Sequence, residues 1–207
     1  MTIHSYSAMS TFLQCPRRYE AQYLLKTHKD KPFDATDRGN RIHAEIESYL
    51  KGERADIPSE TPRDTLLDVL RKAGAKAEVP LAVRHDGTPC DFWAKDGRLR
   101  GKIDALVVVD NTIIALDWKA GKRRDNSLQA AVYGYMLAAR YPEHPIRVVF
   151  DYLSNGRDPA IHYTPEMGKR VEDLMDDIET MQHFPPKPSG LCGWCPVDNC
   201  EYWRERR

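Results

Sequence analysis

Hydrophobic residues recur every three or four positions over residues 5–25 and again over 36–50, which predicts two amphipathic helices. Ser7 is a plausible N-cap for the first helix. Pro16 either interrupts that helix or begins a second one at its first helical position. The same pattern predicts three further helices, over residues 61–73, 126–140 and 165–183.

Residues 78–119 instead hold runs of β-branched and other apolar residues, which favour strands. The pairs Asp86-Gly87 and Asp96-Gly97 are turn signals that divide this region into strands of ordinary length. Two further strands are predicted, separated by an Asn155-Gly156 turn, at residues 146–153 and 160–163. The expected fold class is α/β, with a mixed central sheet flanked by helices.

The most informative segment is an expected hairpin over residues 103–119. Asp110-Asn111 tolerates the left-handed backbone of a tight turn, so Val109 should face Thr112. Counting back along both strands then places Asp104 opposite Asp117, with Cβ atoms about 5 Å apart. Two carboxylates so placed destabilise a sheet unless something offsets their charge, and a divalent cation is the simplest candidate.

Lys119 lies two residues beyond Asp117 and therefore points to the same face of its strand. Two aspartates and a lysine around a hard cation provide the chemistry of phosphodiester hydrolysis. An exposed hairpin with scattered charges is the alternative, but the neighbouring residues are apolar, and buried carboxylates need partners. The same register puts Lys102 opposite Lys119, so we expect the strands to diverge or bulge there.

Four more polar residues are candidates for the same site. Gln129 and Tyr133 are spaced i, i+4 and share one face of the helix that follows the hairpin. His43 lies in the middle of an expected helix, where it is either ordinary packing or a metal ligand. Glu78 begins the β-rich region, and a lone glutamate there is most often a surface charge.

Cys192, Cys195 and Cys200 form a C-x2-C-x4-C pattern in a tail without hydrophobic periodicity, and Cys15 lies near the other end of the chain. Such a tail cannot hold a shape by packing alone. In a cytoplasmic protein this spacing indicates metal ligation rather than disulfides. Four thiolates suit either zinc or an iron–sulfur cluster. Cys90, in a strand-like segment, is the odd cysteine out.

Composition narrows the class of protein. The formal net charge is zero, which argues against a general nucleic-acid coat protein. Charge is local, however, and basic residues flank the hairpin on both sides, as expected for a phosphate-backbone substrate. They are Arg98, Arg100, Lys102, Lys119, Lys122, Arg123 and Arg124. With no signal-peptide pattern and no apolar run near the ~20 residues of a membrane span, we expect a cytoplasmic protein without membrane contact.

Taken in order, these motifs resemble the RecB-like branch of the PD-(D/E)xK nuclease superfamily. The closest resemblance is to CRISPR-associated RecB-like exonucleases and related phage-encoded nucleases that carry an iron–sulfur cluster. The matching motifs are Ser5-x-Ser7…Phe12-x-x-Cys15-Pro16-x-x-Tyr19, Gly39-x-x-x-His43, Gly101-x-x-Asp104, Asp117-x-Lys119, Gln129-x-x-x-Tyr133 and the three tail cysteines. Each motif alone is weak, whereas six in the correct order are strong together.

The resemblance implies a restriction-endonuclease-like fold with Mg²⁺ or Mn²⁺ in the active site. The implied metal ligands are His43, Asp104, Asp117 and the carbonyl of Trp118. Lys119 is implied as the catalytic lysine, with Gln129 and Tyr133 beside it; Glu78 aligns only loosely with a further acidic residue of some members. The resemblance also implies a [4Fe-4S] cluster, rather than zinc, on Cys15, Cys192, Cys195 and Cys200.

The expected function is metal-dependent cleavage of DNA, most simply exonucleolytic on single-stranded ends, in phage recombination or repair or in CRISPR-type DNA processing. We expect one nuclease domain over residues 1–207, in which the segment 184–207 closes onto Cys15 through the cluster. A different class remains open, namely a non-catalytic or partner-dependent DNA-end-binding subunit working with an integrase or recombinase. A zinc-stapled domain of other function is the third interpretation.

Overall fold

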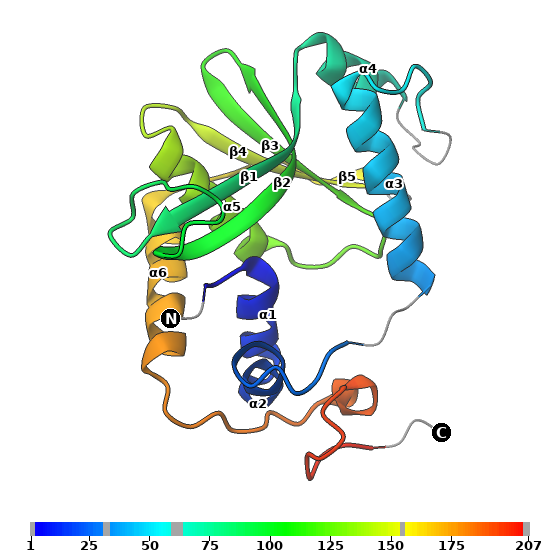
Figure 1. Cartoon of the computed structure of the whole chain (residues 1–207). Coiled ribbons are helices and arrows are strands. Elements are labelled where there is room, and N and C mark those ends of the chain that lie inside the picture. The colour runs from blue at the N-terminus through cyan, green and yellow to red at the C-terminus, as the bar shows by residue number, and fades with distance from the viewer. Residues whose placement is uncertain (1–2, 31–33, 59–63, 154–155, 205–207) are drawn as a thin grey trace.

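A computed structural model describes residues 3–30, 34–58, 64–153 and 156–204 (Figure 1). Its centre is a six-stranded mixed sheet with the order β1-β2-β3-β4-β5, in which β6 also pairs with β4. β3 and β4 are parallel, and the other pairs are antiparallel. The strands are β1 (Lys76–Arg84), β2 (Gly97–Val109), β3 (Thr112–Lys119), β4 (Ile146–Tyr152), β5 (Gly156–Arg157) and β6 (Ile161–His162).

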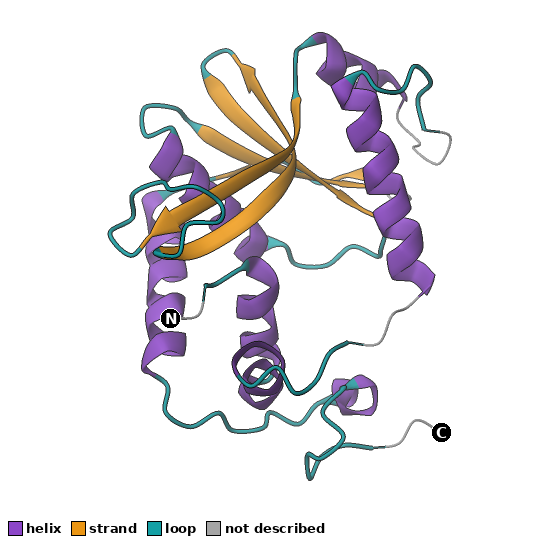
Figure 2. Ribbon diagram, in the orientation of Figure 1, coloured by secondary structure: helices purple, strands orange, loops and turns teal. Residues whose placement is uncertain are grey.

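Helices cover both faces of this sheet (Figure 2), which confirms the predicted α/β class. α1, α5 and α6 share one core with one face, while α3 and α4 build a second core on the other. The helices are α1 (Tyr6–Gln14), α2 (Pro16–Tyr19), the π-helix η1 (Glu20–Leu24), α3 (Asp34–Lys51), α4 (Asp64–Lys72), α5 (Ser127–Arg140), α6 (Pro165–Thr180) and the 3₁₀-helix η2 (Gly190–Trp194).

The predicted N-cap of the first helix is wrong. Ser5, not Ser7, is the N-cap of α1, and its hydroxyl accepts a hydrogen bond from the amide of Ala8 at 3.2 Å. Cys15 then takes an extended conformation that ends α1, and Pro16 begins α2 at its first position, which is one of the two predicted alternatives. The predicted helix start at Thr61-Pro62 and Asn155 of the predicted turn lie outside the described residues.

The alternation of side chains between the two faces of the sheet is interrupted in β1 and β2, where Glu78 lies opposite Asp104. Ile103 belongs to the core of α1, α5 and α6, whereas Ala105 belongs to the core of α3 and α4. Alternate residues of a regular strand share one face, so the pleat is broken between them. Glu78 has a left-handed φ of 49° and is skipped in the pairing, which runs from Ala77↔Ala105 to Val79↔Ile103. Asp104 therefore lies at the junction of the two cores.

The contact between α5 and α6 depends on two glycines that receive the ring of Tyr163. A Cβ on Gly134 would lie 2.2 Å from Tyr163 Cδ2, and one on Gly168 would lie 2.2 Å from Tyr163 Oη. Real Cβ atoms do not approach other atoms so closely. Because Gly134 and Gly168 have no Cβ atom, both helices can pack directly against the Tyr163 ring.

We expect Gly134→Ala to lower the free energy of unfolding by about 1–3 kcal/mol, because overpacking outweighs the gain of about 1 kcal/mol in helix propensity. In a Tyr163→Ala background the same change should be neutral or stabilising, since the clash is gone. Urea denaturation of the four variants of this double-mutant cycle measures both effects. Equal destabilisation in the two backgrounds would contradict the proposed role of the ring.

Candidate active site

The candidate residues come from four elements that meet at one end of β3. Asp117 and Lys119 end this strand, and Gln129 and Tyr133 lie on the first turns of α5. Asp104 reaches the site from β2 and His43 from α3. The structure therefore brings together all the predicted active-site side chains.

The segment between β3 and α5 is anchored to β4 by Tyr152. The Tyr152 hydroxyl accepts hydrogen bonds from the side-chain amide of Asn126 at 2.6 Å and from the amide of Arg124 at 3.1 Å. Tyr152 is 1% exposed. These bonds fix where α5 begins and hence which of its residues face β3. This role of Tyr152 leaves no pattern in the sequence, because its partners lie 26 and 28 residues away.

The predicted hairpin register is confirmed from Val109↔Thr112 to Ala105↔Leu116. Asp104 and Asp117 would form the next pair, but the ladder ends before them, so the predicted direct opposition of the two carboxylates is wrong. The strands diverge here, ahead of the Lys102 and Lys119 pair at which the sequence predicts divergence. Asp104 Oδ2 instead accepts a hydrogen bond from the amide of Trp118 at 2.9 Å. Like charges in direct opposition are unfavourable, and this shift gives Asp104 a backbone donor.

Asp117 is the centre of a buried polar network and is itself 3% exposed. Its Oδ2 atom accepts hydrogen bonds from Gln129 Nε2 at 2.7 Å and from the Tyr133 hydroxyl at 2.8 Å. Its Oδ1 atom lies 2.5 Å from Lys119 Nζ, which also donates to Gln129 Oε1 at 2.8 Å. One glutamine thus orients both the carboxylate and the ammonium group.

Burial raises the pKa of Asp117, and the negative charge of Asp104 raises it further, while Lys119 and Tyr133 oppose both effects. Burial together with the same two carboxylates raises the pKa of Tyr133 well above its usual value, so its hydroxyl stays a donor. His43 Nδ1 lies 3.3 Å from Asp104 Oδ2, and this contact raises the pKa of His43 despite its burial.

The oxygen and imidazole ligands that the site offers are of the chemical type that binds a hard divalent cation. Carboxylate and carbonyl oxygens suit Mg²⁺ and Mn²⁺, and imidazole can complete such a site. Asp117 Oδ1 is buried, and its partner is the ammonium group of Lys119. Within the described residues, no three His, Cys, Asp or Glu side chains converge closely enough to hold an ion as they stand. Binding would therefore require local side-chain adjustment.

One of the basic residues that flank the hairpin, Arg98, is wrongly predicted to meet a phosphate-backbone substrate. Arg98 is 8% exposed and forms ion pairs with Glu179 and Asp176 of α6, so it cannot meet a substrate. Lys102 is exposed, and its Nζ lies 3.3 Å from Glu78 Oε2. Glu78 is thus partly buried beside Asp104 rather than a lone surface charge.

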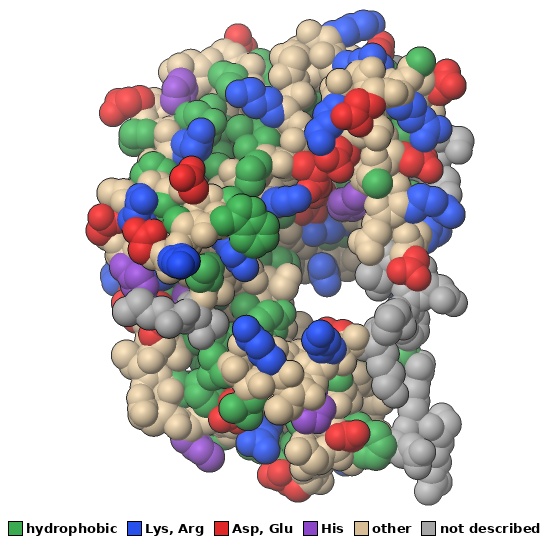
Figure 3. Space-filling view, viewed as in Figure 1, with side chains coloured by type: hydrophobic (Ala, Val, Ile, Leu, Met, Phe, Trp, Pro, Cys, Tyr) green, Lys and Arg blue, Asp and Glu red, His purple; other side chains and the backbone are tan. Residues whose placement is uncertain are grey.

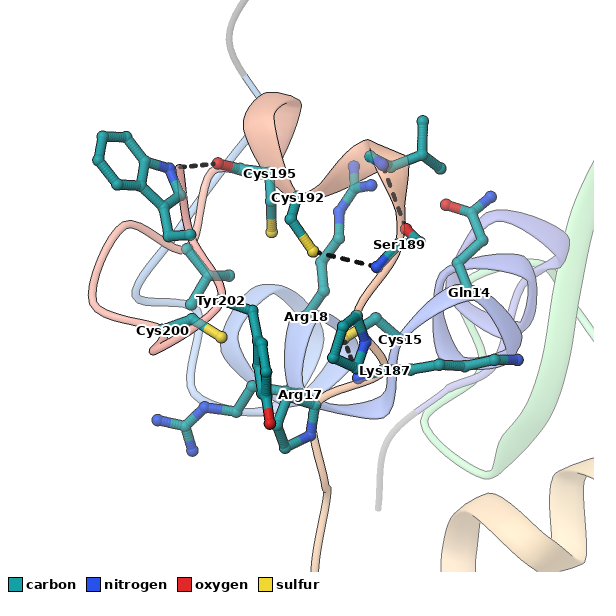
Figure 4. Close-up of a pocket in the computed structure, with 15 residues that line it drawn as sticks. Gln14, Cys15, Arg17, Arg18, Lys187, Ser189, Cys192, Cys195, Cys200 and Tyr202 are labelled. Carbon is teal, nitrogen blue, oxygen red and sulfur yellow. Dashed lines mark hydrogen bonds between the residues drawn. The ribbon is translucent and has the colours of Figure 1, made fainter. Parts of the chain in front are cut away.

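The four predicted ligand cysteines line one pocket (Figure 4), which lies at the end of the molecule opposite the β2–β3 turn (Figure 1). Cys15 comes from the junction of α1 and α2, and the other three come from the tail. The amide of Lys187 donates to Cys15 Sγ at 3.4 Å, and the amide of Ser189 donates to Cys192 Sγ at 3.3 Å. Burial raises the pKa of Cys195. Cys90 is not among the pocket residues.

A comparison with protein families identifies the superfamily of the chain. Residues 4–200 match the family model of the PD-(D/E)XK nuclease superfamily, and the chain belongs to that superfamily. Such nucleases act on DNA and typically use a divalent metal.

Two individual proteins are similar to this chain. The Gene 69 protein of Mycobacterium phage L5 is 25% identical over 195 residues, which are 88% of this chain and 62% of the phage protein. The chain thus spans less than two thirds of that relative. The crystal structure of SSO0001 superposes with a TM-score of 0.56 at 16% identity, over 97% of this chain and 86% of that one, which shows a shared fold. No helix in the described ranges is long and apolar enough to cross a membrane.

The network around Asp117 predicts the effect of removing one hydroxyl. Tyr133→Phe should lower the free energy of unfolding by about 2 kcal/mol at neutral pH, because a buried hydrogen bond to a charged group is lost. The loss should shrink as the pH falls through the raised folded-state pKa of Asp117, since this bond favours the ionised carboxylate. Urea denaturation of wild type and Tyr133→Phe across a pH series, without divalent cations, measures this difference in the free energy of unfolding.

Tyr135→Phe is the matched control for this variant. Tyr135 lies on the same helix, but its hydroxyl donates to Glu172 at the surface, at 2.9 Å. We expect its loss to cost no more than about 0.5 kcal/mol. Similar costs for the two variants at neutral pH would contradict the special position of Tyr133.

Proposed function

We propose that this protein is a divalent-metal-dependent DNA nuclease that degrades single-stranded DNA from its ends. The observation that carries the proposal is the buried Asp117–Lys119–Gln129–Tyr133 network beside Asp104, in a member of a nuclease superfamily. The spacing of these residues resembles that of the RecB-like exonucleases, and this resemblance supports the exonuclease mode.

Each residue of the site has a definable task in this proposal. His43, Asp104, Asp117 and the Trp118 carbonyl would hold Mg²⁺ or Mn²⁺, which supplies a Lewis acid and lowers the pKa of bound water. Lys119 stabilises the negative charge that develops on the phosphate. Gln129 aims Lys119 through its Oε1 atom and holds Asp117 through its Nε2 atom. Tyr133 keeps the Asp117 carboxylate ionised and oriented.

A partner-dependent DNA-end-binding subunit, acting with an integrase or recombinase, is the second candidate. A complete set of catalytic residue types argues against a dead site. It does not argue against a partner that must activate the site.

The decisive experiment offers the protein an end-labelled linear single strand and a closed single-stranded circle, in Mg²⁺ and in Mn²⁺. We expect loss of the linear strand only, and the fate of the label gives the direction of cleavage. Lys119→Ala should reduce the rate at least about a hundredfold, because a fixed cation no longer meets the developing charge. Lys169→Ala, at an exposed lysine of α6 that pairs with Asp173, should leave the rate within about twofold.

Cutting of the circle would replace the exonuclease assignment with an endonuclease one. Cleavage by Lys119→Ala at the normal rate would refute the proposed mechanism. Absence of cleavage by intact wild-type protein would favour the partner-dependent subunit, and copurification with a recombinase or integrase would then identify its role.

We also propose that Cys15, Cys192, Cys195 and Cys200 hold a [4Fe-4S] cluster with a structural role, within one nuclease domain closed by the tail. Two observations support this. All four cysteines line one pocket, and backbone amides donate to two of the sulfurs. Arg18 lines the same pocket, and against the larger effect of burial its positive charge lowers the pKa of Cys195.

Cys195→Ala should lower the iron content from about four per chain and lower the unfolding temperature, with activity following the folded fraction. Cys90→Ala is the matched control and should retain both iron and stability, because Cys90 lies outside the pocket. Metal analysis of anaerobically purified protein, together with thermal melts, checks this. A colourless protein with one zinc per chain would support zinc instead.

A further inference from the structure

An aromatic pair, formed by the exposed Trp93 and the half-buried Phe92, lies on the segment that joins β1 to β2. Trp93 is 77% exposed, the highest value among the large hydrophobic residues of the described chain. Its ring meets that of Phe92 edge to face, with centroids 4.9 Å apart. The guanidinium of Arg100 lies over both rings, 5.0 Å from the centroid of Trp93 and 5.5 Å from that of Phe92. The three side chains form one unit, which we call the Trp93 platform.

The backbone beneath this platform is held in place by hydrogen bonds. Arg84 bonds Asp96 at 2.7 Å and the carbonyl of Pro89 at 2.8 Å, which ties both ends of the segment together. The amide of Cys90 donates to the carbonyl of Ala82 at 3.0 Å. A ligand that stacks on the rings therefore meets a surface that is already ordered, so less conformational entropy is lost on binding.

The platform lies on the same side of the sheet as the candidate active site. Leu99 and Ile103 point into the core with α5, and a Cβ on Gly101 would meet Met136 of that helix. Alternation along β2 therefore directs Arg100 and Lys102 to the opposite face.

That opposite face is the one that carries α3, whose His43 contacts Asp104. Arg100 and Asp104 are four residues apart, or about 13 Å along a strand. Figure 3 shows hydrophobic and basic side chains together over β1 and β2, with acidic side chains and a histidine closer to α3.

A single exposed apolar residue is common and needs no function. Here, however, two rings and a cation are combined, a second cation follows at Lys102, and the series leads toward the carboxylates that would act on a phosphate. Nucleobases stack on aromatic rings and on guanidinium planes, while lysine and arginine pair with phosphates.

Building on the proposed nuclease function, we propose that Phe92, Trp93 and Arg100 form a base-stacking subsite for single-stranded DNA. It holds a nucleotide a few positions away from the bond that is cleaved, and Lys102 meets the intervening phosphates. The contact is independent of sequence, because every base offers a π-face.

The test compares binding of two fluorescent strands of equal length and charge, oligo(dT) and a strand with abasic sites, in buffer without divalent cations. We expect Trp93→Ala to weaken oligo(dT) binding about ten- to hundredfold, with Arg100→Gln also weaker and Trp93→Phe close to wild type. The abasic strand, which has nothing to stack, should bind wild type and Trp93→Ala alike.

Arg140→Gln is the matched control, because Arg140 also lies over an aromatic ring, that of Tyr141 at 5.9 Å, but at the far end of α5. It should bind oligo(dT) as wild type does. The subsite is wrong if Trp93→Ala binds oligo(dT) normally, or if it loses the same affinity for the abasic strand.

Cleavage separates this subsite from the nuclease function on which it rests. Under steady-state conditions Trp93→Ala should raise KM for oligo(dT) about as much as it weakens binding and leave kcat within about twofold. A wild-type protein that cleaves DNA but shows no dependence on Trp93 overturns the subsite alone. A wild-type protein that stacks bases through Trp93 but cleaves nothing overturns the nuclease proposal and leaves the subsite standing.

Discussion

The arrangement of the site depends on keeping one charged carboxylate, that of Asp117, almost completely out of water. An isolated buried carboxylate is unfavourable by several kcal/mol, so the surrounding structure must supply its partners. Lys119 comes from the same strand, two residues on, and needs no further structure. Gln129 and Tyr133 come from α5, and they reach Asp117 only if that helix begins at the right place. Tyr152 of β4 fixes that place, which links the chemistry of the site to the parallel β3–β4 pair.

The break in the pleat at Glu78 and Asp104 has a comparable effect on the other side of the site. In a regular β2, Ile103 and Ala105 would point into the same core, and Asp104 would point to the opposite face of the sheet. The change of faces brings Asp104 to the gap beside β3, where the Trp118 amide and His43 can reach it. It also leaves the first half of β2 with an open face, since α3 and α4 pack on residues beyond the break. The open half is where the Trp93 platform lies.

The sequence predicted what is set by short-range rules. Asp110-Asn111 defines a two-residue turn, and once that turn is known the register of five pairs follows by counting. The side-chain spacing of Gln129 and Tyr133 follows equally from the helix period. The predictions fail where the position of a side chain depends on a partner that is distant in the sequence. Arg98 has the composition of a surface cation, and only the approach of α6, some 80 residues later, makes it a buried ion-pair residue. Ser5 and Ser7 are the same residue type and are equally suitable as N-caps. Which one caps the helix depends on where the backbone becomes helical.

The tail shows how little apolar packing holds the end of the chain. Phe184 stacks on Tyr19 at 6.0 Å and marks the last contact with the main core, and beyond it Val197 is the only buried hydrophobic residue of the described chain. One such residue cannot offset the conformational entropy of about twenty ordered ones. Covalent bonds from Cys15 to the three tail cysteines through a shared metal group would supply what packing does not. This pocket and the Asp117 network share no residue, which agrees with the purely structural role proposed for the group.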